Sequence, residues 1–168
     1  MPVGRAPHKT IEPEPGGEVR LELCRLAVEG DELLEAWRHE LDREGPSYTV
    51  DTLRALRDEL PGEELFFLAG GDQAETLGAW KEPEQVLRLA TLAVAERDAH
   101  RRERITSAIA LVTGSESVSF FEMPAIEVSS SLVRERVREG RPFRHLVAAG
   151  VADQIESAGL YARQEVRT

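Results

Sequence analysis

Residues 64–72, Glu-Leu-Phe-Phe-Leu-Ala-Gly-Gly-Asp, decide the fold. The apolar run has the length of a buried strand, and Gly70-Gly71-Asp72 is typical of the turn that ends one. Residues 82–90 then fit a helix with Pro83 in its first turn, and residues 91–95, Thr-Leu-Ala-Val-Ala, fit a second buried strand. Strands that alternate with helices predict an α/β fold, with a parallel sheet covered on both faces.

The segments on either side continue this alternation. Apolar residues at helical spacing after Thr49, whose hydroxyl can cap a helix, predict a helix that ends before Pro61-Gly62. Residues 32–42 fit either a helix or a loop, and the pattern leaves this open. The other expected elements are a strand at 118–122 and helices at 18–30, 102–112, 132–140, 143–147 and 151–158.

Length and composition limit the class of protein. A chain of 168 residues has the size of one domain, so we expect a single domain over residues 1–168. The formal net charge of −10 argues against nucleic acid and anionic membranes as partners, because both would repel the chain. No apolar run reaches the ~20 residues of a membrane helix. The only cysteine, Cys24, cannot form an intramolecular disulfide, which fits a cytoplasmic location. The oligomeric state stays open, and a homo-oligomer is allowed.

Two turns of the predicted sheet could contribute to a ligand site, because ligands of such sheets bind at the carboxyl ends of strands. Gly70 and Gly71 would let the backbone approach a ligand, and Asp72 would accept hydrogen bonds from it. The alternative is a plain turn. Trp80 could stack on an aromatic ring, and its alternative is a place in the core.

Two further segments could bind an anion. Ser129-Ser130-Ser131 stand before a predicted helix that carries Arg134, so hydroxyls, the helix N-terminus and a guanidinium could hold phosphate. The alternative is a capping serine beside a solvated arginine. His8-Lys9 read as a solvated basic loop on their own. The sequence has no Cys/His array at zinc spacing, and we expect no protein-bound metal.

These segments together resemble one family, the bacterial nicotinate-mononucleotide adenylyltransferases, from Val3 to Tyr161. The most specific match is Gly-Pro-Ser-Tyr-Thr-Val-Asp-Thr-Leu, which resembles the family's Ser-Tyr-Thr-x-Asp-Thr-Leu signature. The other matching segments, in family order, are VGRAPHK, EVRLELCRLAV, FFLAGGD with LGAWKEPEQVL, EVSSSLVRERVREGRPFRHLV and VADQIESAGLY. The resemblance implies a Rossmann-like nucleotidyltransferase fold.

The resemblance also implies a reaction and a role for each matched residue. The family transfers an adenylyl group from ATP to nicotinate mononucleotide, which gives deamido-NAD and pyrophosphate in NAD biosynthesis, with Mg²⁺ accompanying ATP. The implied ATP-phosphate ligands are Ser129, Ser130 and Arg134. His8 and Lys9 are implied to close over the reacting phosphates as catalytic residues. The implied contacts to the nicotinate nucleotide are Ser47, Tyr48, Thr49, Asp72, Trp80 and Lys81.

The sequence departs from the family at its start. Family members begin with a strand that runs into Gly-x-Phe-Asp-Pro-x-His-x-Gly-His, and this phosphate-binding motif does not occur in the 168 residues. We therefore expect the first strand and its motif to be missing, the domain to be incomplete at its N-terminus, and the chain as printed to show negligible turnover. In addition, Glu96-Arg97-Asp98 stands where the family often has Arg-Pro-Gly.

Three readings of the function follow from this departure. The first is an adenylyltransferase of this family whose chain starts late. The second is a degenerate, non-catalytic paralogue that still binds nucleotides. The third is a phosphopantetheine adenylyltransferase, which the Ser-Tyr-Thr segment disfavours.

Overall fold

The computed structural model describes residues 1–6, 15–124 and 126–163. The chain divides into two compact units, Pro46–Ala125 and a second unit that joins Met1–Gly45 to Ile126–Thr168. Each unit has a hydrophobic core of its own. The expectation of a single domain over residues 1–168 stays a prediction.

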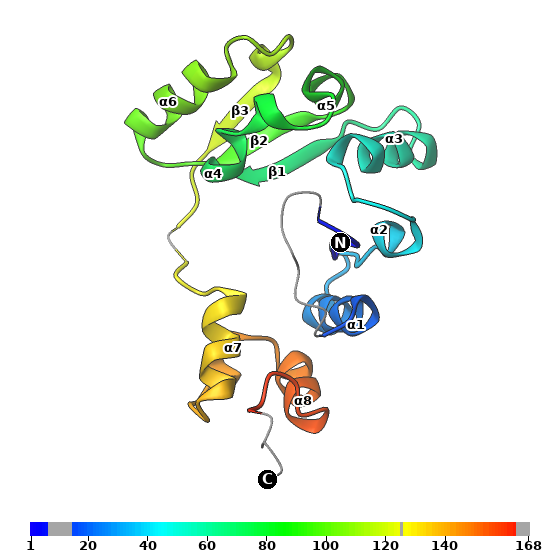
Figure 1. Cartoon of the computed structure of the whole chain (residues 1–168), viewed down its shortest axis with the longest axis vertical. Coiled ribbons are helices and arrows are strands. Elements are labelled where there is room, and N and C mark those ends of the chain that lie inside the picture. The colour runs from blue at the N-terminus through cyan, green and yellow to red at the C-terminus, as the bar shows by residue number, and fades with distance from the viewer. Residues whose placement is uncertain (7–14, 125, 164–168) are drawn as a thin grey trace. The chain divides into compact units, whose positions relative to one another are not determined.

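The unit Pro46–Ala125 is built around a parallel sheet (Figure 1). The strand order is β1-β2-β3, and Phe66 on β1 is in register with Thr91 on β2. This confirms the α/β prediction with a parallel sheet. The elements in chain order are α3 (Thr49–Glu59), β1 (Phe66–Gly70), α4 (Gly71–Ala74), η1 (Leu77–Ala79), α5 (Pro83–Leu89), β2 (Thr91–Ala95), α6 (Ala99–Ile109), η2 (Ser115–Ser117) and β3 (Val118–Phe121).

One face of this sheet forms the core of the unit. Leu92 and Val94 of β2 are fully buried there, and Ile105 of α6 packs in the same cluster. A neighbouring cluster joins α3 to α5 through Val50 and Val86. Burial of these aliphatic side chains stabilises the unit, because it removes apolar surface from water.

The other face of the sheet is a correction to the sequence-based expectation. The apolar run at 64–69 predicts a buried strand, but Phe66 is 57% exposed and Leu68 is 67% exposed. The two side chains share a face because they lie two residues apart on one strand. On the same face, Phe121 of β3 is also exposed. The prediction of a sheet covered on both faces is therefore wrong for the described residues, because this face of β1 and β3 carries exposed apolar side chains.

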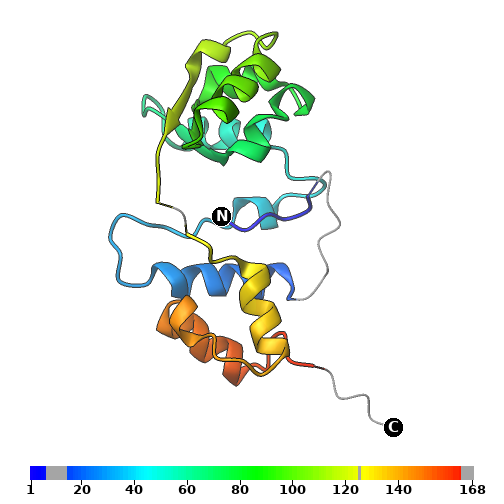
Figure 2. The same cartoon turned by 90° about the vertical axis from the view of Figure 1, so that its left-hand side faces the viewer.

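The second unit consists of helices. Its core joins Leu23 and Leu26 of α1 to Val133 of α7 and to Val151 and Ile155 of α8. Figure 2 shows α1 beside α8, in agreement with their contacts. The segment at 32–42 that the sequence left open contains one short helix, α2. The bounds are α1 Gly17–Val28, α2 His39–Asp42, α7 Ser130–Arg138, η3 Arg144–Leu146 and α8 Ala149–Ser157.

Helix starts were predicted with mixed success. Ser129 caps α7, and its hydroxyl accepts the backbone N–H of Leu132, as the capping alternative expected. Thr49 is not a cap, because it already has a place inside α3 and the extended Tyr48 precedes it as the N-cap residue. Helix α6 starts earlier than the predicted 102–112, because Asp98 caps it by accepting the N–H of Arg101.

Candidate functional site

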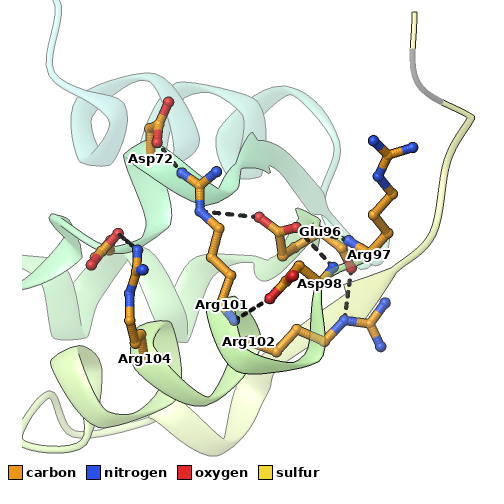
Figure 3. Close-up of polar contacts among 8 residues, drawn as sticks. Asp72, Glu96, Arg97, Asp98, Arg101, Arg102 and Arg104 are labelled. Atoms are coloured by element: carbon orange, nitrogen blue, oxygen red, sulfur yellow. Dashed lines mark hydrogen bonds and ion pairs between the residues drawn. The ribbon is translucent and has the colours of Figure 1, made fainter.

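Charged residues gather where the strands of the sheet end (Figure 3). Asp72 follows β1 in the first turn of α4, and Glu96 follows β2 directly. Arg101 lies on α6 and approaches both carboxylates. We call Asp72, Glu96 and Arg101 the carboxyl-end cluster. Its position is the one at which parallel sheets bind ligands.

Glu96 has the least exposed side chain of this cluster. Its side chain is 9% exposed, and Oε1 accepts the backbone N–H groups of Arg97 and Asp98 at 2.9 and 3.0 Å. Oε2 lies 3.2 Å from Nε of Arg101. The guanidinium of Arg101 then binds Oδ1 of Asp72 through Nη2. The side chain of Asp72 is 91% exposed, so Arg101 lies between one exposed carboxylate and one largely covered carboxylate.

The two glycines before Asp72 differ in the space that a side chain would find there. A Cβ on Gly71 would lie 2.6 Å from Oε2 of Glu96 and 3.2 Å from Nε of Arg101. A Cβ on Gly70 would meet nothing within 4 Å. Sequence reasoning expected both glycines to leave room for a ligand, but the space at Gly71 is filled by Glu96 and Arg101. Gly71 is therefore explained by packing within the chain.

A second group of candidate residues meets at the start of α3. The ammonium group of Lys81 lies 4.7 Å from the ring centroid of Tyr48 and 3.0 Å from Oδ2 of Asp51. Asp51 also pairs with Arg54 at 3.2 Å. Tyr48, Lys81 and the first turn of α3 thus lie together, with Thr49 as the first residue of the helix. Ser47, the residue before Tyr48, is buried.

An ion pair anchors the segment that follows Lys81. Arg54 binds both carboxylate oxygens of Glu82, at 2.5 and 3.3 Å. Hydrogen bonding from Arg54 lowers the pKa of Glu82 below its usual range. Glu82 adopts a left-handed backbone conformation, with φ of 51°, which costs energy in a residue other than glycine. The pair with Arg54 holds this turn on α3.

Trp80 takes part in packing. It is half-buried, and its ring meets Phe67 edge-on at 5.9 Å with an interplanar angle of 88°. The indole N–H donates to Oγ1 of Thr76 at 3.3 Å. The core alternative therefore has support in these contacts. A stacking role for the exposed part of the ring stays a prediction.

The ATP-phosphate candidates lie in the other unit, around a pocket of about 270 Å³. Ser129, Ser130 and Arg134 line it, and the rest of its wall is mainly aliphatic, with Leu23, Val133, Leu146, Val147, Val151 and Ile155. Arg134 donates to Oγ of Ser131 at 3.1 Å. Tyr161, with φ of 63°, also lines the pocket, and burial raises the pKa of its phenol. The pocket combines an apolar wall with donors for an anion.

Some predicted site residues cannot be placed, and others were missed. His8 and Lys9 lie outside the described residues. The described part of the chain holds no group of three His, Cys, Asp or Glu residues that could hold a metal ion. Sequence reasoning missed Glu96 and Arg101. An acidic residue directly after a predicted strand was the available signal for Glu96, whereas nothing local indicated Arg101.

None of the helices in the described ranges is long and apolar enough to cross a bilayer.

The described residues form a parallel sheet with helices, and polar residues lie at its strand ends and at helix starts. A cytidylyltransferase-like family model matches residues 1–136. Similar curated proteins are probable nicotinate-nucleotide adenylyltransferases. That of Tropheryma whipplei (strain Twist) is 35% identical over 161 residues, which cover 96% of this chain and 81% of the relative. That of Rubrobacter xylanophilus is 33% identical over 169 residues, which cover 100% of this chain and 79% of the relative. That of Thermus thermophilus is 40% identical over 157 residues, which cover 94% of this chain and 78% of the relative. This chain belongs to the nicotinate-nucleotide adenylyltransferase family.

Proposed function

We propose that this protein transfers an adenylyl group from ATP to nicotinate mononucleotide. An oxygen of the nucleotide's 5′-phosphate forms a bond to the α-phosphorus of ATP, and the bond from that phosphorus to the bridging oxygen breaks. Pyrophosphate leaves with the electron pair, and deamido-NAD is the product. The observation behind this proposal is the family membership of the chain, together with the group of Tyr48, Lys81 and the first turn of α3.

The start of α3 suits the nicotinate carboxylate. The N-terminus of a helix offers unpaired N–H groups and the positive end of the helix dipole, and Thr49 adds a hydroxyl there. Lys81, which also pairs with Asp51, supplies an ammonium group beside Tyr48. Ser47 and Tyr48 would present further donors to the carboxylate. The exposed part of Trp80 would lie against the pyridine ring, and Asp72 would accept hydrogen bonds from the ribose hydroxyls.

The pocket at the start of α7 suits ATP. Ser129, Ser130 and Arg134 supply hydroxyl and guanidinium donors for phosphate oxygens. The aliphatic wall offers contact to the flat face of a base. Mg²⁺ would arrive with ATP and neutralise part of the triphosphate charge. His8 and Lys9 would close over the reacting phosphates. No covalent intermediate is needed, so the protein acts by alignment and charge stabilisation.

Calorimetric titration of the 168-residue chain tests the proposal for the pyridine nucleotide. We expect nicotinate mononucleotide to bind at least tenfold more tightly than nicotinamide mononucleotide, because only the former carries a carboxylate for Lys81. Lys81→Ala should remove this preference. Arg88→Ala, at an exposed position on α5, is the matched control and should keep it. Equal affinity for the two nucleotides in the wild type, or no binding of either, would contradict the proposal.

Turnover is a separate measurement. The expectation that the chain as printed has negligible activity stays a prediction, and rapid pyrophosphate release from ATP and nicotinate mononucleotide would prove it wrong. Binding of both nucleotides without turnover agrees with a late start and with a non-catalytic paralogue. Tight binding of phosphopantetheine in place of the pyridine nucleotide would favour the third reading.

A further inference from the structure

We propose that Glu96 and Arg101 are positioning residues that hold the carboxylate of Asp72 ready for the ribose hydroxyls of the nucleotide. The inference rests on the proposed function, which gives Asp72 its ligand. It adds two residues that neither the family match nor the sequence motifs assign.

The geometry leaves one oxygen of Asp72 open to a ligand. Arg101 engages Oδ1, while the side chain as a whole is 91% exposed. A carboxylate accepts hydrogen bonds at both oxygens, so Oδ2 can serve the vicinal hydroxyls of a ribose. A guanidinium that grips one oxygen fixes the rotation of the carboxyl group, which an exposed aspartate otherwise has free.

The chain of contacts continues inward to a fixed point. Two backbone N–H groups bind Oε1 of Glu96, which immobilises this 9% exposed side chain at the end of β2. Its Oε2 then faces Nε of Arg101 at 3.2 Å. The Nε atom of Arg101 is buried and makes no hydrogen bond, but it lies within ion-pair distance of Oε2 of Glu96, while Nη2 binds Asp72.

Gly71 shows that the surrounding backbone is adapted to this pair. Any Cβ at this position would overlap Oε2 of Glu96, so the turn that presents Asp72 depends on a glycine. Ordering Asp72 before the ligand arrives lowers the entropic cost of binding, which is the physical advantage of the arrangement.

The first experiment measures ribose recognition directly. Calorimetry compares nicotinate mononucleotide with its 2′,3′-dideoxyribose analogue, and the ratio of the two dissociation constants is the readout. We expect a ratio of at least ten in the wild type and a ratio near one in Asp72→Asn. Arg101→Gln and Glu96→Gln should each reduce the ratio at least threefold. A residue that only stabilises the fold would change the melting temperature and leave this ratio unchanged.

Arg104→Gln is the matched control. Arg104 lies on α6 as well and pairs with Glu75 at 3.5 Å, away from Asp72. Its variant should keep the wild-type ratio. Arg101→Lys should recover part of the discrimination, because an ammonium can reach a carboxylate but cannot contact both carboxylates through one rigid fork. A wild-type ratio in Arg101→Gln, with a ratio near one in Asp72→Asn, overturns this inference alone.

A second measurement needs no nucleotide. The buried Nε–H of Arg101 should exchange its hydrogen more slowly than the Nε–H of Arg104, and Glu96→Gln, which removes the ion pair, should reduce the difference. Equal exchange at the two arginines in the wild type overturns the positioning role whatever the nucleotide does. If exchange at Arg101 is slow but the chain binds no nicotinate mononucleotide, the pair exists and the proposed function, with the ribose as ligand, is wrong.

Discussion

The two groups of candidate binding residues differ in what holds them. In the unit Pro46–Ala125, Asp72 is bound by Arg101, which lies 29 residues away, and Lys81 is bound by Asp51, 30 residues away. At the start of α7, Arg134 contacts Ser131, and Ser129 contacts Leu132, each three residues away. The first group is fixed by tertiary structure and the second by the local geometry of one helix. Changes at supporting residues should therefore matter in the first group, and changes at ligand-facing residues in the second.

The largest effect is expected at Gly71. Gly71→Ala forces a Cβ against Glu96 and Arg101, and overpacking of this kind costs about 1–3 kcal/mol. Urea unfolding should show this loss, and the ribose discrimination should fall with it. Gly70→Ala is the matched control, since its Cβ meets nothing within 4 Å and its φ is −79°. Equal stability of the two variants would mean that Glu96 and Arg101 move aside at little cost and do not hold Asp72 in one conformation.

Arg134→Ala tests the locally held group. We expect ATP to bind at least tenfold more weakly, about 1.4 kcal/mol, because a guanidinium contact to phosphate is lost. The free energy of unfolding should hardly change, because alanine favours the helix and the contact to Ser131 is exposed. Arg138→Ala, in the last turn of α7, should leave the affinity for ATP unchanged. Unchanged ATP affinity in Arg134→Ala would leave this arginine as a solvated side chain.

Trp80 packs against Phe67 and is also proposed to contact the pyridine ring, and one variant can separate these two roles. Trp80→Ala should weaken nicotinate mononucleotide several-fold, since a stacked aromatic pair contributes about 0.5–1.5 kcal/mol beyond burial. The same variant should lose less stability than the about 3–5 kcal/mol of a fully buried tryptophan, because the ring is only half-buried. Thermal melts and titrations with nicotinate mononucleotide are run on the wild type and on Trp80→Ala. A lower melting temperature with unchanged affinity per folded molecule would leave packing as the only role.

The smallest effect concerns the ion pair of Arg54 and Glu82. Because the pKa of Glu82 is lowered in the folded protein, its stabilising contribution is present above the pKa of an unfolded glutamate, about 4.3, and is lost as pH falls through the folded value. Glu82→Gln should thus be less stable than the wild type at pH 6, and the difference should shrink towards pH 3. Urea midpoints across this range measure it. Glu84→Gln, in the first turn of the helix that Glu82 precedes, is the control. A Glu82→Gln difference that is constant with pH would contradict the assignment.

The sequence predicted those features of the fold that depend on residues close together in the chain, such as the bounds of strands and helices. Apolar runs and glycine or proline breaks placed β1, β2 and α5 within a residue or two, and Ser129 could be recognised as a cap because its partner lies three residues away. The exposure of Leu68 could not be predicted, because it depends on which helices cover a face. The link from Glu96 through Arg101 to Asp72 also lay beyond the sequence, since it depends on three segments meeting at the strand ends.

Crossed titration of two nucleotides against two variants tests the central claim, that the chain binds a nicotinate nucleotide and ATP through different groups of residues. Calorimetry is run with nicotinate mononucleotide and with Mg²⁺-ATP on the wild type, Lys81→Ala and Arg134→Ala. The account predicts that both nucleotides bind the wild type, that Lys81→Ala weakens only nicotinate mononucleotide, and that Arg134→Ala weakens only ATP. Failure of either nucleotide to bind the wild type, or weakening of the same nucleotide by both variants, would contradict it.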